Sequence, residues 1–121
     1  MTLQVGIVGG SGYTGSELLR YLHFHPHAQV TQITSRERAG QYAYTTHPHL
    51  RGLSTLQFIH PDALQPCDLL FLALPHGSAA RSIEHYAALA PTIIDLSADF
   101  RLSDPAAYAR WYGETHPAPQ W

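Results

Sequence analysis

The sequence predicts an α/β protein built on a doubly wound parallel sheet. Short apolar segments rich in β-branched residues alternate with segments of helical periodicity, which is the pattern of parallel strands joined by helical crossovers. A glycine-rich turn separates the first strand from the first helix, as in dinucleotide-binding folds of the Rossmann type. The 121 residues, 45% of them hydrophobic, can bury one core but are few for a two-domain enzyme, so we expect one domain over residues 1–121.

The first strand is expected over residues 3–8, whose apolar run is typical of a strand buried in a parallel sheet. The helix after the glycine turn carries Leu18, Leu19 and Leu22 at helical spacing. This helix should end near Pro26, because the residue before a proline avoids the α region of backbone conformation.

The remaining elements follow from shorter segments. Residues 29–34 alternate and are β-branched, and residues 68–74 are almost continuously apolar, as in a strand covered on both faces. Between them, residues 35–54 are polar without clear periodicity, and a segment of this length is usually functional or contains a short helix. Further strands are expected over residues 55–59 and 92–97, and helices over residues 79–89 and from the cap at Ser103–Pro105 to about Gly113.

Composition excludes several classes of function. The net charge is −2 and the seven basic residues are all arginine, so we expect no broad basic surface for nucleic acid or anionic lipid. The absence of lysine excludes a phosphate-binding loop that ends in Gly-Lys and a lysine Schiff base within these residues. No apolar run approaches the ~20 residues of a membrane helix, no signal peptide is recognised, and the single cysteine gives no disulfide framework, so we expect a cytoplasmic protein.

The glycine turn predicts a site for the diphosphate of a dinucleotide. Glycine lets the chain turn at positive φ and lets the backbone approach a phosphate, while the first amides of the next helix face its charge. Two spacings overlap, Gly10-x-Gly12-x-x-Gly15 and Gly9-x-x-Gly12-x-x-Gly15, and the sequence does not choose between them. The alternative is a glycine-rich surface turn without a ligand. The predicted cofactor-binding residues of the turn are Gly9, Gly10, Ser11, Gly12, Tyr13, Thr14 and Gly15.

The end of the second strand indicates which dinucleotide is bound. Enzymes that prefer the cofactor without a 2′-phosphate place an acidic residue about 20 residues after the glycines, where it binds the ribose hydroxyls. Here Ser35 stands at that position and Arg36 follows, and a hydroxyl with a guanidinium suits a 2′-phosphate. We therefore predict that Ser35, Arg36 and Glu37 contact NADP(H). Two alternatives stay open: Arg36 and Arg38 are solvated loop charges, or Glu37 binds the non-phosphorylated cofactor.

Six short blocks occur in an order that resembles a known family. The chain is similar to the acyl-phosphate reductases of arginine and lysine biosynthesis within the semialdehyde dehydrogenase superfamily, namely the N-acetyl-γ-glutamyl-phosphate reductases and the related reductases of carrier-bound aminoadipyl phosphate. Residues 89–91 and 110–114 resemble the lysine branch somewhat more, and Gly10 stands where the family usually has alanine. The blocks are Gly9–Gly15, Thr34–Arg36 with Ala39-Gly40, His47–Gly52, Leu72–Gly77, Asp95–Leu102 and Trp111–Gly113.

The resemblance implies a reaction in which a cysteine thiolate attacks an acyl phosphate, phosphate leaves, and hydride from NADPH reduces the thioester to a semialdehyde while a histidine serves as acid and base. By the same resemblance both residues lie beyond Trp121, so we expect a truncated chain with no catalytic residue and no turnover of its own. The implied partners are a small-molecule or carrier-protein-bound acyl phosphate and, for the full-length protein, further copies of itself. The resemblance also implies that Leu74, Pro75, His76 and Gly77 contact the cofactor.

Other polar residues have weaker interpretations. Cys67 lies at the start of the fourth strand, about 25 Å from Pro75 at its far end, so we interpret it as structural rather than nucleophilic. Ser97, Asp99 and Arg101 share a face if the fifth strand continues, and Arg101 could then hold the phosphate of the substrate. A structural pair of Asp99 and Arg101 explains both residues equally well.

The nine histidines predict no metal site. Histidines in the segments 23–27 and 47–49 alternate and do not share a helix face, and no cysteine or carboxylate nearby completes a ligand set. Two other functions stay open for the whole chain. An extended short-chain reductase or epimerase has the same Gly-x-x-Gly-x-x-Gly turn, and a non-catalytic NADP-sensing module would need only the cofactor site.

Overall fold

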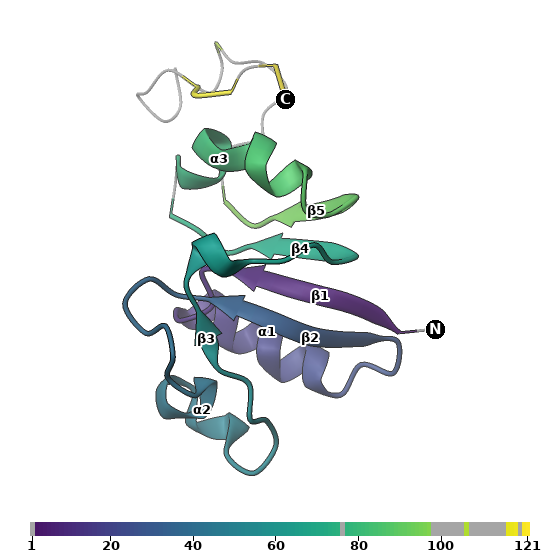
Figure 1. Cartoon of the computed structure of the whole chain (residues 1–121), viewed down its shortest axis with the longest axis vertical. Coiled ribbons are helices and arrows are strands. Elements are labelled where there is room, and N and C mark those ends of the chain that lie inside the picture. Colours follow the sequence, from purple (N-terminus) through teal and green to yellow (C-terminus); the bar gives the residue numbers. More distant parts are fainter. Residues whose placement is uncertain (1, 76, 98–105, 107–115, 119) are drawn as a thin grey trace.

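The computed structural model describes residues 2–75, 77–97, 106, 116–118 and 120–121. Within them, five parallel strands form one sheet in the order β3-β2-β1-β4-β5 (Figure 1). The chain moves outward from β1 to β3 on one side and starts again with β4 on the other, which makes the sheet doubly wound and confirms the predicted fold class. The strands are β1 (Leu3–Val8), β2 (Ala28–Thr34), β3 (Phe58–Ile59), β4 (Leu69–Leu72) and β5 (Thr92–Asp95).

Helices connect the strands. Figure 1 shows α1 running alongside β1 and β2, and α3 beside β5 at the other end of the sheet. α1 ends at His23, shortly before Pro26, as the sequence predicts. The helices are α1 (Tyr13–His23), α2 (Ala43–Thr46) and α3 (Ser78–Ala87), with 3-10 turns η1 (Pro48–Leu50) and η2 (Pro61–Ala63).

Two apolar clusters pack on opposite faces of the sheet. Because successive strand residues point to opposite faces, Ile7 joins the cluster with Leu19 of α1, whereas Val8 joins the cluster with Ile83 of α3. The first cluster also contains Leu50, which is 2% exposed. The segment between β2 and β3 is therefore fastened to the core although its sequence is largely polar.

The polar segment over residues 35–54 contains the short helices α2 and η1, so the prediction of a hidden helix is confirmed. The third strand is shorter than predicted, because residues 55–57 turn toward this segment instead of β2. Gln57 forms an antiparallel bridge with Tyr42, and the carbonyl of Leu56 accepts a hydrogen bond from the amide of Ala43 at 2.8 Å. Only Phe58 and Ile59 then pair with β2.

The fifth strand also ends earlier than predicted. The amide and the hydroxyl of Ser97 both donate hydrogen bonds to the Asp95 carboxylate at 2.9 Å, and this local turn ends the strand at Asp95. The predicted shared face of Ser97, Asp99 and Arg101 required the strand to continue through Ser97. The strand instead ends at Asp95. Asp99, Arg101 and the predicted helix up to Gly113, apart from Ala106, lie outside the described residues. In the part of the chain that is described, no helix has the length and apolar character to cross a membrane.

Candidate functional site

The three glycines at positions 9, 12 and 15 have three different structural roles. Gly9 has φ +80°, and a Cβ on it would lie 2.6 Å from the carbonyl oxygen of Ala73 at the end of β4. A Cβ on Gly15 would lie 2.5 Å from the carbonyl oxygen of Gly10, so α1 packs directly on the turn. Gly12 precedes α1 and has open space around the position of its Cβ.

These contacts select one of the two overlapping spacings. The tight turn, the open approach and the close packing expected of a dinucleotide turn fall on Gly9, Gly12 and Gly15. Gly10 has no positive φ, and a Cβ on it would lie 3.3 Å from the Cβ of Ile33, which is close but reaches only a side chain. An alanine at this position, which the resemblance associates with the family, therefore needs a shift of a few tenths of an ångström between the turn and β2, much less than a Cβ at Gly9 or Gly15 would need.

Three hydrogen bonds hold the turn against the sheet and the following segment. The amide of Gly9 donates to the hydroxyl of Thr34 at 3.0 Å, and the amide of Gly10 donates to the carbonyl of Thr34 at 2.9 Å. The Nε2 atom of His47 lies 2.7 Å from the carbonyl oxygen of Gly10. Sequence reasoning did not assign Thr34 or His47 to the site, although both lie in blocks that it singled out.

The N-terminus of α1 is open to an anion. Its cap residue Gly12 offers no side-chain hydrogen bond, and its first turn carries no acidic residue. Tyr13 and Thr14 are the first two residues of α1, so their amides have no carbonyl of a preceding helical turn to bind. These two amides donate to none of the described residues. Free amides and the helix dipole together make this end of α1 suited to a phosphate group.

A pocket of about 510 Å³ opens beside the turn, at the carboxyl ends of β1, β2 and β4. This is the edge of the sheet where the strand order reverses, and ligands of doubly wound folds bind there. The pocket brings together residues that are far apart in the sequence but were predicted to bind the cofactor. They are Gly9, Ser11, Ser35, Arg36, Glu37, Leu74 and Pro75.

Other members of the predicted set lie nearby or are not described. Gly12 and Tyr13 border a smaller cavity that adjoins the pocket at Ser11, and Gly77 caps α3 with φ +87°. His76 and Arg101 lie outside the described residues. The pocket also contains residues that sequence reasoning missed. These are Val8, Thr34, Pro61, Ser78, Arg81, Ser82 and Tyr86, of which only Arg81 carries a charge that could have signalled its role.

Two arginines from different parts of the fold line the pocket. Arg36 follows β2, Arg81 comes from α3, and neither forms an ion pair within the described part of the chain. Burial raises the pKa of Tyr86, and the nearby positive charge of Arg36 opposes this shift. The charge of Arg36 therefore acts as far as Tyr86 on α3, the helix that also carries Arg81.

Ser35 is buried, and its hydroxyl group can still donate one hydrogen bond. Its amide donates to the carbonyl of Ile59 at 3.0 Å, and its Oγ accepts a hydrogen bond from the amide of Arg38 at 3.2 Å. Because Oγ acts as acceptor there, its own proton remains available to a ligand oxygen. Arg38 does not line the pocket, so the two arginines of this segment differ in position.

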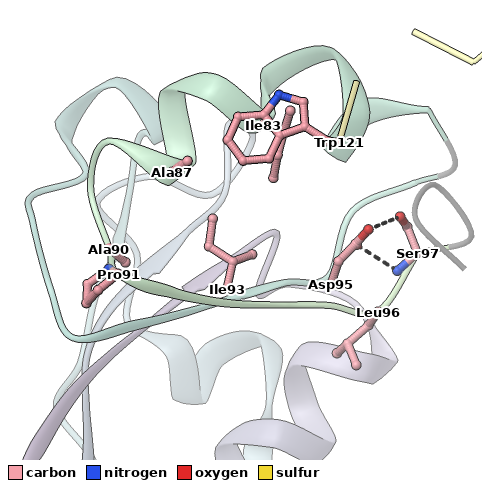
Figure 2. Close-up of a pocket in the computed structure, with 9 residues that line it drawn as sticks. All are labelled: Ile83, Ala87, Ala90, Pro91, Ile93, Asp95, Leu96, Ser97 and Trp121. Carbon is pink, nitrogen blue, oxygen red and sulfur yellow. Dashed lines mark hydrogen bonds between the residues drawn. The ribbon is translucent and has the colours of Figure 1, made fainter. Parts of the chain in front are cut away.

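A larger cavity of about 770 Å³ lies between α3 and β5, with Trp121 above it (Figure 2). Its walls are mainly apolar side chains such as Ile83 and Ile93. Its acidic side chain, Asp95, is engaged by the amide and hydroxyl of Ser97. The glycine turn does not reach this cavity, so we do not assign the cofactor to it.

Cys67 lies at the opposite end of the sheet from the pocket. Its sulfur is 3.5 Å from where a Cβ on Gly6 would stand, and it contacts the carbonyl of Leu69 at 3.5 Å. Burial raises the pKa of this thiol, which disfavours the nucleophilic thiolate. Among the described residues, no group of three histidine, cysteine or acidic side chains is placed to hold a metal ion.

Comparison with known proteins agrees with this geometry. Residues 4–113 match the family model described as "Semialdehyde dehydrogenase, NAD binding domain". The crystal structure of aspartate semialdehyde dehydrogenase with NADP from Candida albicans has a TM-score of 0.64 to this chain at 16% identity, covering 98% of this chain and 41% of that chain. At this identity the likeness concerns the fold alone.

Curated relatives are similar over almost the whole chain. The LysW-L-2-aminoadipate 6-phosphate reductase of Deinococcus radiodurans is 52% identical over 96% of this chain and 33% of its own length. The N-acetyl-gamma-glutamyl-phosphate reductase of Marinobacter nauticus is 50% identical over 98% of this chain and 35% of its own length. A protein of Thermomicrobium roseum, provisionally named as the former reductase, is 57% identical over 98% of this chain and 34% of its own length. The chain thus spans about a third of the length of these relatives.

Proposed function

The chain belongs to the family of semialdehyde dehydrogenase NAD-binding domains, and from this premise we propose that it is the NADP(H)-binding part of an acyl-phosphate reductase. The reaction would reduce N-acetylglutamyl phosphate, or an aminoadipyl phosphate attached to a carrier protein, to the semialdehyde with release of phosphate. Relatives named for each of these reactions support both substrates. The observation that carries the proposal is the convergence of the glycine turn, Ser35 and Arg36 on one pocket.

Each part of the pocket suits one part of the cofactor. The open amides at the start of α1 would bind the diphosphate, since Gly12 leaves room for its approach. The free proton of Ser35 and the guanidinium of Arg36 would bind the 2′-phosphate. We infer that Arg81, which lines the same pocket, adds a second positive charge to this phosphate.

The cofactor supplies the hydride when it is bound. The residues of this chain would hold it at the carboxyl edge of the sheet, where Leu74 and Pro75 border the same pocket. Cys67 is the single cysteine of the sequence and lies at the other edge, with its pKa raised by burial. We therefore infer that the nucleophilic thiol of the reductase comes from outside residues 1–121.

Titration of the purified protein with NADPH and with NADH tests the proposal. We expect NADPH to bind at least about tenfold more tightly, because one charge-assisted contact to the 2′-phosphate is worth about 1.5–3 kcal/mol. Fluorescence of the reduced nicotinamide reports both affinities. Equal affinity for the two cofactors, or no binding of either at millimolar concentration, would contradict it.

A further inference from the structure

The segment His47–Gly52 is one of the blocks that sequence reasoning singled out, yet the cofactor site described above does not use it. Its first residue, His47, is 5% exposed and lies between α2 and η1. Pro48 follows it, and a residue before proline is disfavoured in the α region, so α2 ends at Thr46. The chain then turns so that the imidazole of His47 reaches the glycine turn.

His47 is held firmly in this position. Its amide donates to the carbonyl of Ala43 at 2.8 Å, and its carbonyl accepts from the amide of Leu50 at 3.0 Å. Ala43 and Leu50 are both buried in the cluster beneath α1. The imidazole also meets the ring of Phe58 edge-on, with the ring centres 6.2 Å apart. The core therefore fixes where the Nε2 atom of His47 lies.

Gly10 is restrained at both of its peptide groups by residues already described. Its amide donates to the carbonyl of Thr34 at 2.9 Å, and its carbonyl oxygen lies 2.7 Å from Nε2 of His47. Gly15 packs so closely on this carbonyl that only a residue without a side chain fits there. A carbonyl is a hydrogen-bond acceptor, so the His47 nitrogen that faces it must carry a proton and donate.

This hydrogen bond has a consequence for the next amide. A peptide group is planar, and no cis peptide bond occurs in the part of the chain that the structure describes. In a trans peptide, the carbonyl of one residue and the amide of the next point in opposite directions. Fixing the Gly10 carbonyl on His47 therefore turns the Ser11 amide away from His47. Ser11 lines the cofactor pocket, and its amide donates to none of the described residues.

We propose that His47 is a positioning residue for the cofactor, which orients the Ser11 amide toward the diphosphate by donating a hydrogen bond to the Gly10 carbonyl. The inference rests on the proposed function, since it names a residue that prepares the same site. It assigns His47 no direct contact with the cofactor. The His47–Gly52 block thereby has a role in the cofactor site, namely to hold the Nε2 proton of His47 against the Gly10 carbonyl.

The test compares two variants and two ligands. His47→Leu removes the donor and keeps an apolar side chain of moderate size, while His47→Gln retains an N–H donor on a side chain of comparable reach. NADPH contains the diphosphate, whereas adenosine 2′-monophosphate contains only the 2′-phosphate part and should not depend on the Ser11 amide. We expect His47→Leu to weaken NADPH about tenfold, His47→Gln to stay within about twofold of wild type, and adenosine 2′-monophosphate to bind all three proteins equally.

The outcomes separate the inference from the proposed function. If wild type binds neither ligand, the proposed function is wrong. If wild type binds NADPH and His47→Leu binds it equally well, if His47→Gln loses as much as His47→Leu, or if both ligands weaken together, the positioning role is wrong while the cofactor site stands.

A measurement on the wild-type protein does not depend on the variants folding. Nitrogen-15 NMR of the imidazole, recorded where His47 is neutral, identifies which ring nitrogen carries the proton. We expect the proton on Nε2. A bare Nε2 would overturn the inference, because two acceptors would then face each other at 2.7 Å.

Discussion

The amide of Gly9 donates a hydrogen bond to the side-chain hydroxyl of Thr34 at 3.0 Å, across 25 positions of sequence. Thr34 is the last residue of β2 and is 1% exposed, and the neighbouring amide of Gly10 donates to its carbonyl. One residue of β2 thus holds two successive amides of the glycine turn. The turn that faces the proposed cofactor pocket is supported by the strand that leads to Ser35.

We expect Thr34→Val to lower the free energy of unfolding by about 1–3 kcal/mol. Valine has nearly the same shape but no hydroxyl, so the half-buried Gly9 amide would lose its partner beside the fully buried Thr34 side chain. Urea denaturation measures the loss. Thr34→Ser keeps the hydroxyl and serves as control. A valine variant as stable as the serine variant would show that this hydrogen bond does not support the turn.

Alanine substitutions in the turn should differ sharply between two glycines. At Gly15, inside α1, alanine would ordinarily favour the helix, but its Cβ would lie 2.5 Å from the Gly10 carbonyl oxygen, so we expect a loss of about 1–3 kcal/mol in the free energy of unfolding. At Gly10 the nearest atom is the Cβ of buried Ile33 at 3.3 Å, which needs a shift of a few tenths of an ångström, so we expect a smaller loss than at Gly15. Thermal unfolding of the two variants side by side checks the order, and a stabilised Gly15→Ala would refute the packing argument.

Arg36→Ala should weaken the binding of NADPH by about 1–3 kcal/mol and leave that of NADH nearly unchanged, because only NADPH has the 2′-phosphate that the guanidinium would contact. Arg38→Ala is the matched control, since Arg38 carries the same charge two residues away but does not line the pocket. Fluorescence titration gives the affinities. Equal losses for both cofactors, or equal effects of the two variants, would argue against the assignment of the 2′-phosphate.

Arg81→Ala should also weaken NADPH binding selectively, by a smaller factor of about three to ten, because this side chain lines the same pocket but is exposed to solvent. Glu84→Ala changes an exposed charge on the same helix outside the pocket and should have no comparable effect. The same titrations apply. If Arg81→Ala leaves the preference for NADPH intact, Arg36 and Ser35 alone account for it.

Cys67 should react slowly with iodoacetamide. Because burial raises the pKa of its thiol, the thiolate fraction at pH 8 is smaller than for a free cysteine, and the rate should rise with a midpoint above the ordinary value of about 8.5. The same protein unfolded in urea gives the reference rate. We also expect the alkylated protein to bind NADPH as before, since Cys67 lies at the far edge of the sheet. Rapid alkylation, or a large loss of affinity afterwards, would contradict its structural role.

The order of the elements could be predicted from local patterns. The apolar segment over residues 3–8, the glycine turn and the leucines of α1 each indicate their structure through neighbouring residues, and the alternation of strands and helices then implies a parallel sheet. Ser35 and Arg36 were predicted to bind the cofactor in the same way, from their distance along the chain to the glycines, and both line the pocket beside the turn. The family resemblance rests on these short blocks and is confirmed by the matching family model.

Contacts between distant segments were decided only by the folded chain. Sequence spacing allowed two glycine patterns, and the choice of Gly9 over Gly10 came from Ala73, which follows β4, and Ile33 of β2. His47 and Arg81 reach the site because buried neighbours such as Leu50 and Ile83 fix the elements that carry them. Periodicity reports how one segment is buried, but which side chains meet depends on how several segments pack together, and that information is not contained in any one of them.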